Sequence, residues 1–593
     1  AIYRAGPRPP RLFEPDVWQA VQEHVERVGP QPPLESRVMD GVGFVMLESR
    51  PHSEELADRA GVAFRYGYAL GHHHNDNLNV ELFAHGENLA PELGYPTWAH
   101  PLGGTGDAVH HCTGMIDRSN QYPGAIGKGW VELFSAAPEA SFADLAAAPS
   151  GFPNRMYRRA ICLADAPEGN IYLFDVLRMA GGSQRTWCFH GPMHDQFEAS
   201  VQFGPEAQEP FSLTSVARSL NNNILAPQQA RADDDVWADW KFRDRELHIR
   251  THLLGEPERE YFTARYGKTD VPDIRFLFAE DTTEDGASEF VAIWEPYEQQ
   301  PFIERIERLQ IQGQADEEEF TPVAVRVWSR GGQVDTFIYS HDPQARLQVG
   351  DIEFQGSFGY WSEQDGQPRC LHLVNGSRLT GAGRGVTEAV PHVSGHVTAV
   401  DLAERLITVD FSLPVGDRLR GQQLYTQYGP HRTTWRIEEV LEPGNVIRYD
   451  LDSLSYRSKI EGIGDTPETL LVEMPFPKPG CGGPQPFSYY DGCLLTGEDL
   501  QAAYRIIGVA NPSDNAESAK LILDRAVELA DFPDIDGDGR HMAYIYHFGT
   551  GDRVTLFHSA FVDFSSGSIV SSTEAKVEGL QGVPQILGAT FGQ

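Results

Sequence analysis

The stretch GHHHNDNLNVELFAHGENLAPELGY, residues 71–95, predicts a β-hairpin and carries several of the candidate functional side chains. Leu78, Val80 and Leu82 recur with a period of two, which is typical of a half-buried strand. The run His85-Gly86-Glu87-Asn88 has the composition of a turn that would reverse the chain. We therefore expect two antiparallel strands around this turn.

Two histidines and an aspartate precede the first of these strands. If the chain is already extended there, His72, His74 and Asp76 point to one face, because alternate side chains do. Two imidazoles and a carboxylate are costly to bury unless they bind a ligand or transfer a proton, so they indicate a metal site or a proton-transfer site. The alternative is that both histidines are polar residues on the protein surface.

At these residues the sequence resembles the C-terminal β-sheet domain of the heparinase II/III-like polysaccharide lyases. The motifs that carry the resemblance are His72-His73-His74-Asn75-Asp76, Glu92-Leu93-Gly94-Tyr95 and His111-Cys112-Thr113. Further similar stretches are Tyr172 to Arg178 with Gly181-Gly182, and His190-Gly191-Pro192. The resemblance extends over roughly residues 36 to 380 and rests on the order and spacing of these motifs together.

The resemblance implies a divalent metal, zinc by preference, held by His74, Glu92 and His111. Two imidazoles and one carboxylate are a sound zinc set with one position left open. Glu92 departs from the family, whose members usually have aspartate there, and its longer arm shifts the geometry. Asp76 would then orient one of the histidines or, alternatively, bind the metal directly.

The resemblance also implies β-elimination at a uronic acid of an acidic polysaccharide. Such a lyase removes the proton α to the carboxylate and expels the 4-linked sugar, so it needs a group that neutralises the carboxylate and a base of near-neutral pKa. His72 would act at the substrate carboxylate, and Tyr95 and His190 are the further catalytic candidates. A packed tyrosine and a hydrogen-bonded histidine at a strand end are the alternatives for these two.

Tyr68, Arg118 and Trp98 are the candidates for substrate binding. Arg118 could contact an acidic sugar, and Trp98 could serve as an aromatic platform. An isolated arginine is also common on protein surfaces, so Arg118 has a plain structural alternative.

The composition restricts the partners. The 593 residues include 85 acidic and 48 basic residues, which gives a net charge of −37. Nucleic acid is disfavoured as a partner, because phosphate binding needs a basic surface. An acidic polysaccharide would bind only in a locally basic groove. No apolar run is long enough to span a membrane, and the resemblance implies a secreted or periplasmic enzyme whose oligomeric state stays open.

Many short strands separated by turn residues predict a mainly β fold: stacked antiparallel sheets (a super-sandwich), a small β-barrel insert and a β-rich C-terminal domain. The expected units are a helical tail or linker at 1–35, a heparinase II/III-like β-sandwich at 36–384, the barrel insert at 385–450 and the C-terminal β-rich unit at 451–593.

Helices are expected at Asp16 to Val28, Ser141 to Ala148 and Ala516 to Ala530. The family places a helical toroid before the sheets, and only the first of these helices resembles its tail. The usual toroid is therefore expected to be missing or reduced, and whether one lies upstream or in a partner chain stays open.

Asp534, Asp536 and Asp538 resemble the start of a calcium loop, with glycines between and after them. The twelfth position of that loop is Ile545 instead of glutamate, so the EF-hand pattern is incomplete and an Asp/Gly turn is the alternative. Cys481 and Cys493 flank a Gly/Pro-rich loop and could form a disulfide.

Two other functions remain open at this point. A glycoside hydrolase would need a pair of carboxylic acids across a cleft, for which Asp76, Glu81 and Asp117 are the nearest candidates. A non-catalytic carbohydrate-binding chain would need aromatic platforms but no histidines. The sequence contains no P-loop, no GxSxG elbow and no HExxH motif, which disfavours nucleotide enzymes, serine hydrolases and zincin proteases.

Overall fold

The computed structural model describes residues 35–580, apart from residues 54, 68–73, 95–103, 122–128, 150–153, 215–222, 268–273, 315–318, 474–489, 511–517 and 536. Its regular structure consists of antiparallel strands and a few short 3-10 helices, so the predicted mainly β fold is confirmed. The helix expected at Asp16 to Val28 lies outside the described residues. In the described part of the chain, no helix has the length and hydropathy that a membrane span requires.

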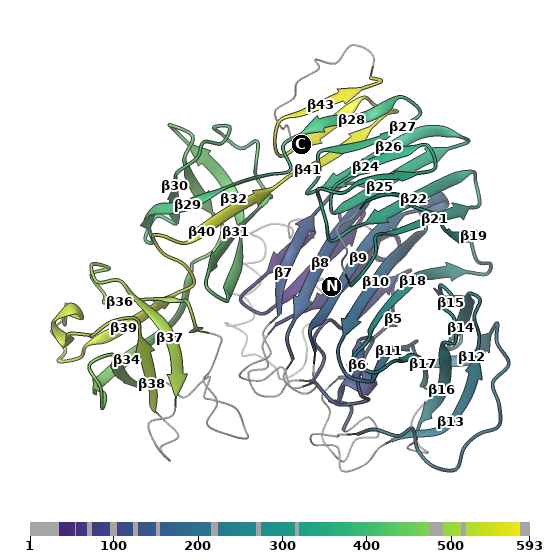
Figure 1. Ribbon diagram of the computed structural model, residues 1–593, viewed down its shortest axis with the longest axis horizontal. Coiled ribbons are helices and arrows are strands. Elements are labelled where there is room, and N and C mark those ends of the chain that lie inside the picture. The colour runs from purple at the N-terminus through teal and green to yellow at the C-terminus, as the bar shows by residue number, and fades with distance from the viewer. Residues whose placement is uncertain are drawn as a thin grey trace, which may run out of the picture.

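Five open sheets form one lobe of the molecule (Figure 1). The first sheet contains β1 (Arg37–Met39), β2 (Phe44–Ser49), β3 (Ala60–Arg65), β4 (Val80–Ala84) and β5 (Glu87–Ala90). The second contains β13 (Ile224–Arg231), β16 (Glu260–Tyr266), β17 (Arg275–Thr282), β11 (Gln184–His190) and β6 (Gly114–Ile116). The eight-stranded sheet contains β12 (His194–Ala199), β14 (Val236–Phe242), β15 (Leu247–Leu253), β18 (Ala287–Glu298), β10 (Ile171–Ala180), β9 (Met156–Asp165), β8 (Ala140–Ala147) and β7 (Gly129–Ser135).

Two more sheets extend the stack. The seven-stranded sheet contains β19 (Ile303–Arg308), β21 (Val323–Ser329), β22 (Gln333–Tyr339), β25 (Phe358–Gln364), β26 (Gln367–Val374), β41 (Ser559–Asp563) and β42 (Ser568–Ser571). The six-stranded sheet contains β20 (Gln312–Gln314), β23 (Arg346–Val349), β24 (Ile352–Gln355), β27 (Arg378–Gly381), β28 (Arg384–Ala389) and β43 (Ala575–Glu578). The 3-10 helices are η1 (Leu56–Asp58), η2 (Ala108–His110), η3 (Pro167–Gly169) and η5 (Leu529–Asp531).

The eight-stranded sheet is buried on both faces. One face, which includes Leu145 and Ile161, packs on the two five-stranded sheets. The other face, which includes Phe142 and Phe174, packs on the seven-stranded sheet, whose outer face in turn covers the six-stranded sheet. The sheets are therefore stacked in layers, as the sequence predicts.

The helix expected at Ser141 to Ala148 is wrong, because residues 140–147 form β8 in the middle of this stack. Phe142 stacks on Phe358 of the next layer at 4.0 Å between ring centroids, while Ala143 and Leu145 face the opposite core. A strand buried on both faces loses the period-two alternation, and alanine-rich sequence then reads as helix. The helix expected at Ala516 to Ala530 is also wrong over its described part, which forms β38 and η5.

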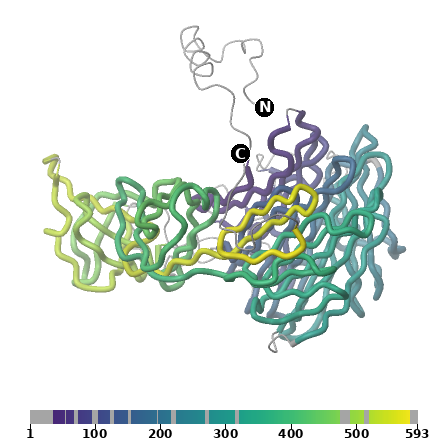
Figure 2. The backbone as a smooth tube through the Cα atoms, turned by 90° about the horizontal axis from the view of Figure 1, so that it is seen from above, coloured from purple at the N-terminus to yellow at the C-terminus, as the bar shows by residue number. Residues whose placement is uncertain are grey.

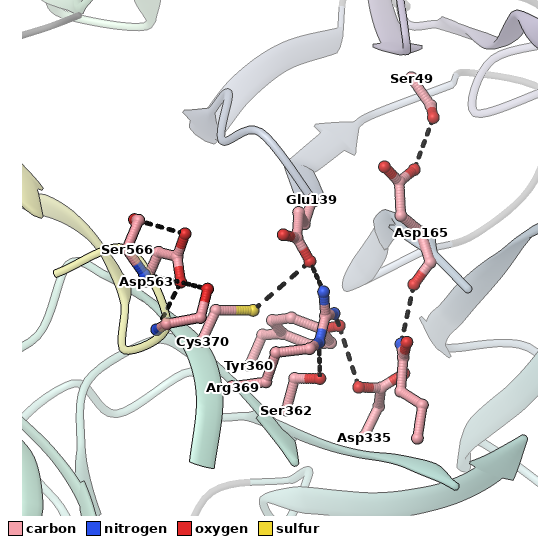
Figure 3. Close-up of polar contacts among 12 residues, drawn as sticks. Ser49, Glu139, Asp165, Asp335, Tyr360, Ser362, Arg369, Cys370, Asp563 and Ser566 are labelled. Carbon is pink, nitrogen blue, oxygen red and sulfur yellow. Dashed lines mark hydrogen bonds and ion pairs between the residues drawn. The ribbon is translucent and has the colours of Figure 1, made fainter. Parts of the chain in front are cut away.

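Polar bridges join the layers as well (Figure 3). The fully buried Asp335 accepts hydrogen bonds from Tyr172 of the eight-stranded sheet at 2.6 Å and from Tyr360 of its own sheet at 3.0 Å. Burial raises the pKa of Asp335, while these donors favour its charged form. Arg369 pairs with Glu139, which lies just before β8. The layers are thus aligned by directional contacts in addition to apolar packing.

Two closed barrels form a second lobe (Figure 2). The first barrel contains β29 (His392–Asp401), β30 (Leu406–Val409), β33 (Val446–Tyr449), β32 (His431–Leu441), β31 (Gln423–Tyr428) and β40 (Arg553–Phe557). The second barrel contains β34 (Leu454–Ile463), β35 (Thr469–Glu473), β38 (Ser518–Leu523), β37 (Tyr504–Ala510), β36 (Leu494–Thr496) and β39 (Met542–Tyr546). The second barrel is inserted between β33 and β40 of the first, and the first is inserted between β28 and β41 of the sheet lobe.

The first barrel docks against β7 at the edge of the eight-stranded sheet. Arg432 pairs with Glu132 at 3.0 Å, and the Tyr425 hydroxyl accepts a hydrogen bond from the backbone N–H of Phe134 at 2.8 Å. These contacts fix the barrel beside the sheet stack.

Glu48 on β2 should make the stability of this fold depend on pH. Burial raises its pKa to about 7, partly offset by Arg59. Because this pKa is raised in the folded state, the contribution of Glu48 to the free energy of unfolding depends on pH. The contribution is fully present below the pKa of the unfolded state, near 4.5, and is lost as the pH rises through about 7. We expect Glu48→Gln to raise the thermal midpoint above pH 7 and to have little effect below pH 4.5. Thermal scans across this range test the prediction, with the exposed Glu304→Gln on β19 as control. A difference that does not change with pH would contradict it.

Candidate metal centre

The site is built around the carboxylate of Glu92, which lies between two imidazoles. Its Oε1 is 2.8 Å from Nδ1 of His74, and its Oε2 is 3.1 Å from Nδ1 of His111. The two rings lie 5.0 Å apart between centroids, and both are buried. The three side chains that the sequence predicts as metal ligands therefore lie together.

Each of the three residues comes from a different loop beside the β4–β5 hairpin. The predicted hairpin is confirmed, with His85-Gly86 as a two-residue turn in which both residues have positive φ. Glu92 follows β5 after Pro91, and His111 directly follows η2. His74 and Asp76 lie in irregular chain before β4, so the strand does not extend back to these two residues.

A buried ion pair in the eight-stranded sheet holds two of these loops. Arg159 on β9 pairs with Asp175 on β10 through two contacts of 2.8 and 2.6 Å, and both side chains are fully buried. The remaining nitrogen of Arg159 donates to the carbonyl oxygens of Leu78 at 2.9 Å and Cys112 at 2.6 Å. The guanidinium thus fixes the chain four residues after His74 and directly after His111.

Direct contacts join the same two loops. The side-chain oxygen of Asn79 accepts a hydrogen bond from the backbone N–H of Cys112 at 2.9 Å. Thr113 donates to the carbonyl oxygen of Asn77 at 2.5 Å, and Gln121 donates to the Tyr157 hydroxyl at 2.8 Å in the same buried cluster. Thr113 belongs to the His111-Cys112-Thr113 motif. Sequence reasoning missed Asn79, Gln121 and Tyr157, because polar side chains scattered along a chain give no periodic signal.

The charges of the cluster are mutually dependent. Burial by itself would raise the pKa of Glu92, but the two imidazoles outweigh it and hold that pKa well below its usual range. Burial would lower the pKa of His111, but Glu92 outweighs it and raises that pKa. Burial raises the pKa of Asp76, which pairs with Arg65 at 3.1 Å. A negative carboxylate facing two imidazoles is the arrangement that a cation would also favour.

The donor set fits a divalent metal. Two imidazoles and one carboxylate suit zinc, and the donor atoms of His74, Glu92 and His111 all lie within 4.8 Å of one another. Nε2 of His111 is buried and has no hydrogen-bond partner among the described residues. Gly106 lies against His74, where an added Cβ would come within 3.2 Å of the ring. The loops therefore enclose the cluster closely.

Four of the other candidate residues, His72, Tyr95, Tyr68 and Trp98, lie outside the described residues. His190 ends β11 in the core, and its Nδ1 lies 3.0 Å from the carbonyl oxygen of Gly191. Burial lowers the pKa of His190 to about 4, so this imidazole is neutral at neutral pH.

Arg118 forms an ion pair and ring contacts with neighbouring side chains. Its guanidinium forms two contacts of 2.8 Å with Glu280 and lies over the rings of Phe211 and Phe262 at 4.4 and 5.0 Å. This is the fork geometry of a structural ion pair. A role for Arg118 in substrate binding stays a prediction.

The candidate calcium loop forms a turn around Asp534. Its carboxylate accepts hydrogen bonds from the backbone N–H groups of Gly537, Asp538 and Gly539 at 2.9, 3.1 and 2.8 Å. Asp536 lies outside the described residues. Ile545 is buried in β39, so the twelfth position of the loop pattern belongs to a strand. These contacts are those of an Asp/Gly turn.

No protein-family description matches the chain, and no curated protein is similar to it in sequence. The search of solved structures returned distant similarities. Heparan sulfate lyase HepC from Pedobacter heparinus is 14% identical with a TM-score of 0.36, and the match covers 56% of this chain and 46% of that one. A heparinase III gene product is 12% identical with a TM-score of 0.38, covering 55% and 46%. A putative aldose 1-epimerase from Escherichia coli is 10% identical with a TM-score of 0.25, covering 40% and 96%. The chain thus spans less than half the length of the two lyases.

Proposed function

We propose that this chain is a lyase that cleaves a uronic-acid-containing polysaccharide by β-elimination, in a secreted or periplasmic setting. The observation that carries the proposal is the buried His74–Glu92–His111 cluster, formed by the residues whose motifs resemble the heparinase II/III-like lyases. A stack of antiparallel sheets holds this cluster, which agrees with the fold that the resemblance implies.

His74, Glu92 and His111 would hold a zinc ion. Bound there, the ion would supply positive charge that fixes the loops carrying its ligands. Glu92 orients both imidazoles through their Nδ1 atoms. Arg159 holds the backbone carbonyls of Leu78 and Cys112, so the loops keep their positions when a polymer binds. The site would thus be rigid before the substrate arrives.

The elimination itself requires three functions around the uronate. A cation or hydrogen-bond donor neutralises the carboxylate, a base removes the proton on C5, and an acid protonates the departing 4-linked oxygen. We assign the first function to His72 and one proton-transfer function to Tyr95. His190, which is buried and neutral, would keep the neighbouring backbone in place.

The experiment that tests the proposal is the absorbance of unsaturated uronate products in the ultraviolet. The chain would be incubated with alginate, glycosaminoglycans, ulvan and pectin, with and without a chelator. We expect a rising signal on one of them and a loss of that signal after metal removal. His72→Ala should abolish turnover while polysaccharide binding persists.

The same panel also separates the alternatives. New reducing ends without ultraviolet absorbance would show a hydrolase and overturn the proposal. Binding without any cleavage, on a chain with a full metal content, would show a non-catalytic carbohydrate-binding function and would also overturn it.

A further inference from the structure

A second cluster of metal-ligating side chains lies at the junction of the two barrels. His431 is the first residue of β32 in the first barrel, and Cys493 directly precedes β36 in the second. His547 follows β39 on the segment that leads back to the first barrel. Their donor atoms all lie within 4.8 Å of one another. The cluster therefore draws on both barrels and is built independently of the Glu92 site.

The distances within the cluster match those between ligands of one metal ion. Nε2 of His431 lies 3.3 Å from Nδ1 of His547 and 3.5 Å from Sγ of Cys493. With zinc–nitrogen bonds of about 2.0–2.1 Å and a zinc–sulfur bond of about 2.3 Å, tetrahedral ligands are separated by about 3.3 Å (N to N) and about 3.6 Å (N to S). Two of the three donor pairs thus already have the spacing that a bound ion imposes, and the third pair, Cys493 and His547, lies within 4.8 Å.

The backbone is shaped for this approach. Gly492, next to Cys493, has φ +94°, and an added Cβ would come within 2.5 Å of the Tyr428 carbonyl oxygen and 2.8 Å of Cβ of His431. Only glycine lets the loop of the second barrel lie this close to the β31–β32 hairpin of the first. The rings of His431 and His547 are stacked at 5.4 Å, so the imidazoles are held in parallel.

A buried ion pair fixes the same junction. Arg505 of the second barrel pairs with Asp552, which directly precedes β40 of the first barrel. Arg505 also donates to the carbonyl oxygen of Gly492 at 3.0 Å. The position of Cys493 relative to His431 is therefore set by contacts that do not involve the thiol.

We propose that His431, Cys493 and His547 bind a Zn²⁺ ion that ties the second barrel to the first. One thiolate and two imidazoles are a donor set that zinc prefers. On binding, the Cys493 thiol releases its proton to solvent, its sulfur and the two imidazole nitrogens each donate an electron pair to the ion, and a water molecule takes the fourth position. Cys493 and His431 are buried, so the bound ion is largely shielded from bulk water.

Cobalt substitution tests this site separately from the Glu92 site. The full chain would be stripped of metal under reducing conditions and titrated with Co²⁺. Only the barrel site offers a thiolate, so we expect a thiolate-to-cobalt charge-transfer band in the near ultraviolet. Cys493→Ser should abolish this band, remove one equivalent of bound metal and weaken zinc binding at that site by more than ~100-fold. Glu92→Gln should remove the other equivalent and leave the band unchanged.

Two further variants sharpen the test. Cys370→Ser removes another buried thiol, in the seven-stranded sheet, and should change neither the band nor the metal content. Gly492→Ala should weaken the band, because the added methyl group separates Cys493 from His431.

Three results would overturn the proposal. The first is Co²⁺ saturation without a thiolate band. The second is a band that persists in Cys493→Ser. The third is a disulfide between Cys481 and Cys493 in a non-reduced peptide map of the native protein. None of these results concerns the Glu92 site, so the lyase proposal is tested separately by the ultraviolet assay.

Discussion

Glu92→Gln is expected to remove one equivalent of bound metal and, under the proposed function, to reduce lyase turnover to background. The carboxylate faces Nδ1 of His74 with one oxygen and Nδ1 of His111 with the other. An amide of the same shape is neutral, and its NH₂ group only donates, so it offers one accepting oxygen in place of two and no negative charge for a cation. Affinity at this site should fall by more than ~100-fold. Metal analysis by mass spectrometry and the ultraviolet assay measure the two effects.

A graded series separates the loss of charge from the loss of fold. Glu92→Asp keeps the charge on a shorter arm and should bind metal more weakly than the wild type but better than Glu92→Gln. Glu304→Gln, on the exposed edge strand β19, should match the wild type in both assays. Full metal content and full turnover in Glu92→Gln would show that the cluster is not the site.

Asp175→Asn is expected to cost about 3–5 kcal/mol of the free energy of unfolding of the sheet lobe. The change leaves the charge of Arg159 fully buried without its carboxylate partner. Because the same guanidinium donates to the carbonyl oxygens of Leu78 and Cys112, the loops that carry His74 and His111 should also lose their anchor. Urea unfolding followed by tryptophan fluorescence measures the first effect, and a lower metal affinity at the Glu92 site reports the second.

The double variant Arg159→Met/Asp175→Leu distinguishes a buried charge from lost packing. It removes both charges at once and should be less destabilised than Asp175→Asn. An exposed pair provides the matched control: Arg231 and Glu258 are 57% and 83% exposed, so Glu258→Gln should change the free energy of unfolding by less than about 0.5 kcal/mol. Equal costs for the buried and the exposed pair would contradict the prediction.

Local sequence patterns were sufficient to predict part of this architecture. The alternation from Leu78 to Leu82 and the His85-Gly86 turn predict the hairpin that the structure contains. The pattern failed at residues 140–147, where both faces of β8 are buried and alternation disappears. Two-sided burial is a property of the stack, and no local window of sequence contains it.

The candidate sites show the same limit. His74, Glu92 and His111 could be grouped because their motifs resemble those of one family in order and spacing. The barrel cluster has no such pattern, since Cys493 lies 62 residues and His547 lies 116 residues from His431. Only the closure of two barrels brings these three side chains together. Arg159 was missed for a related reason, because the sequence around an arginine in a strand does not show that its ion-pair partner, Asp175, lies on the neighbouring strand.

The nested insertion of the barrels also constrains the order in which the chain can fold during synthesis. Strands β41 and β43 pair with β26 and β28, yet both barrels are translated between these partners. The barrels can close while the seven- and six-stranded sheets still lack their last strands, and those sheets expose open edges until then. Completion of the sheet lobe is therefore a late, long-range step of the kind that slows folding. It requires the chain to leave the barrel lobe beside the strands from which it entered that lobe.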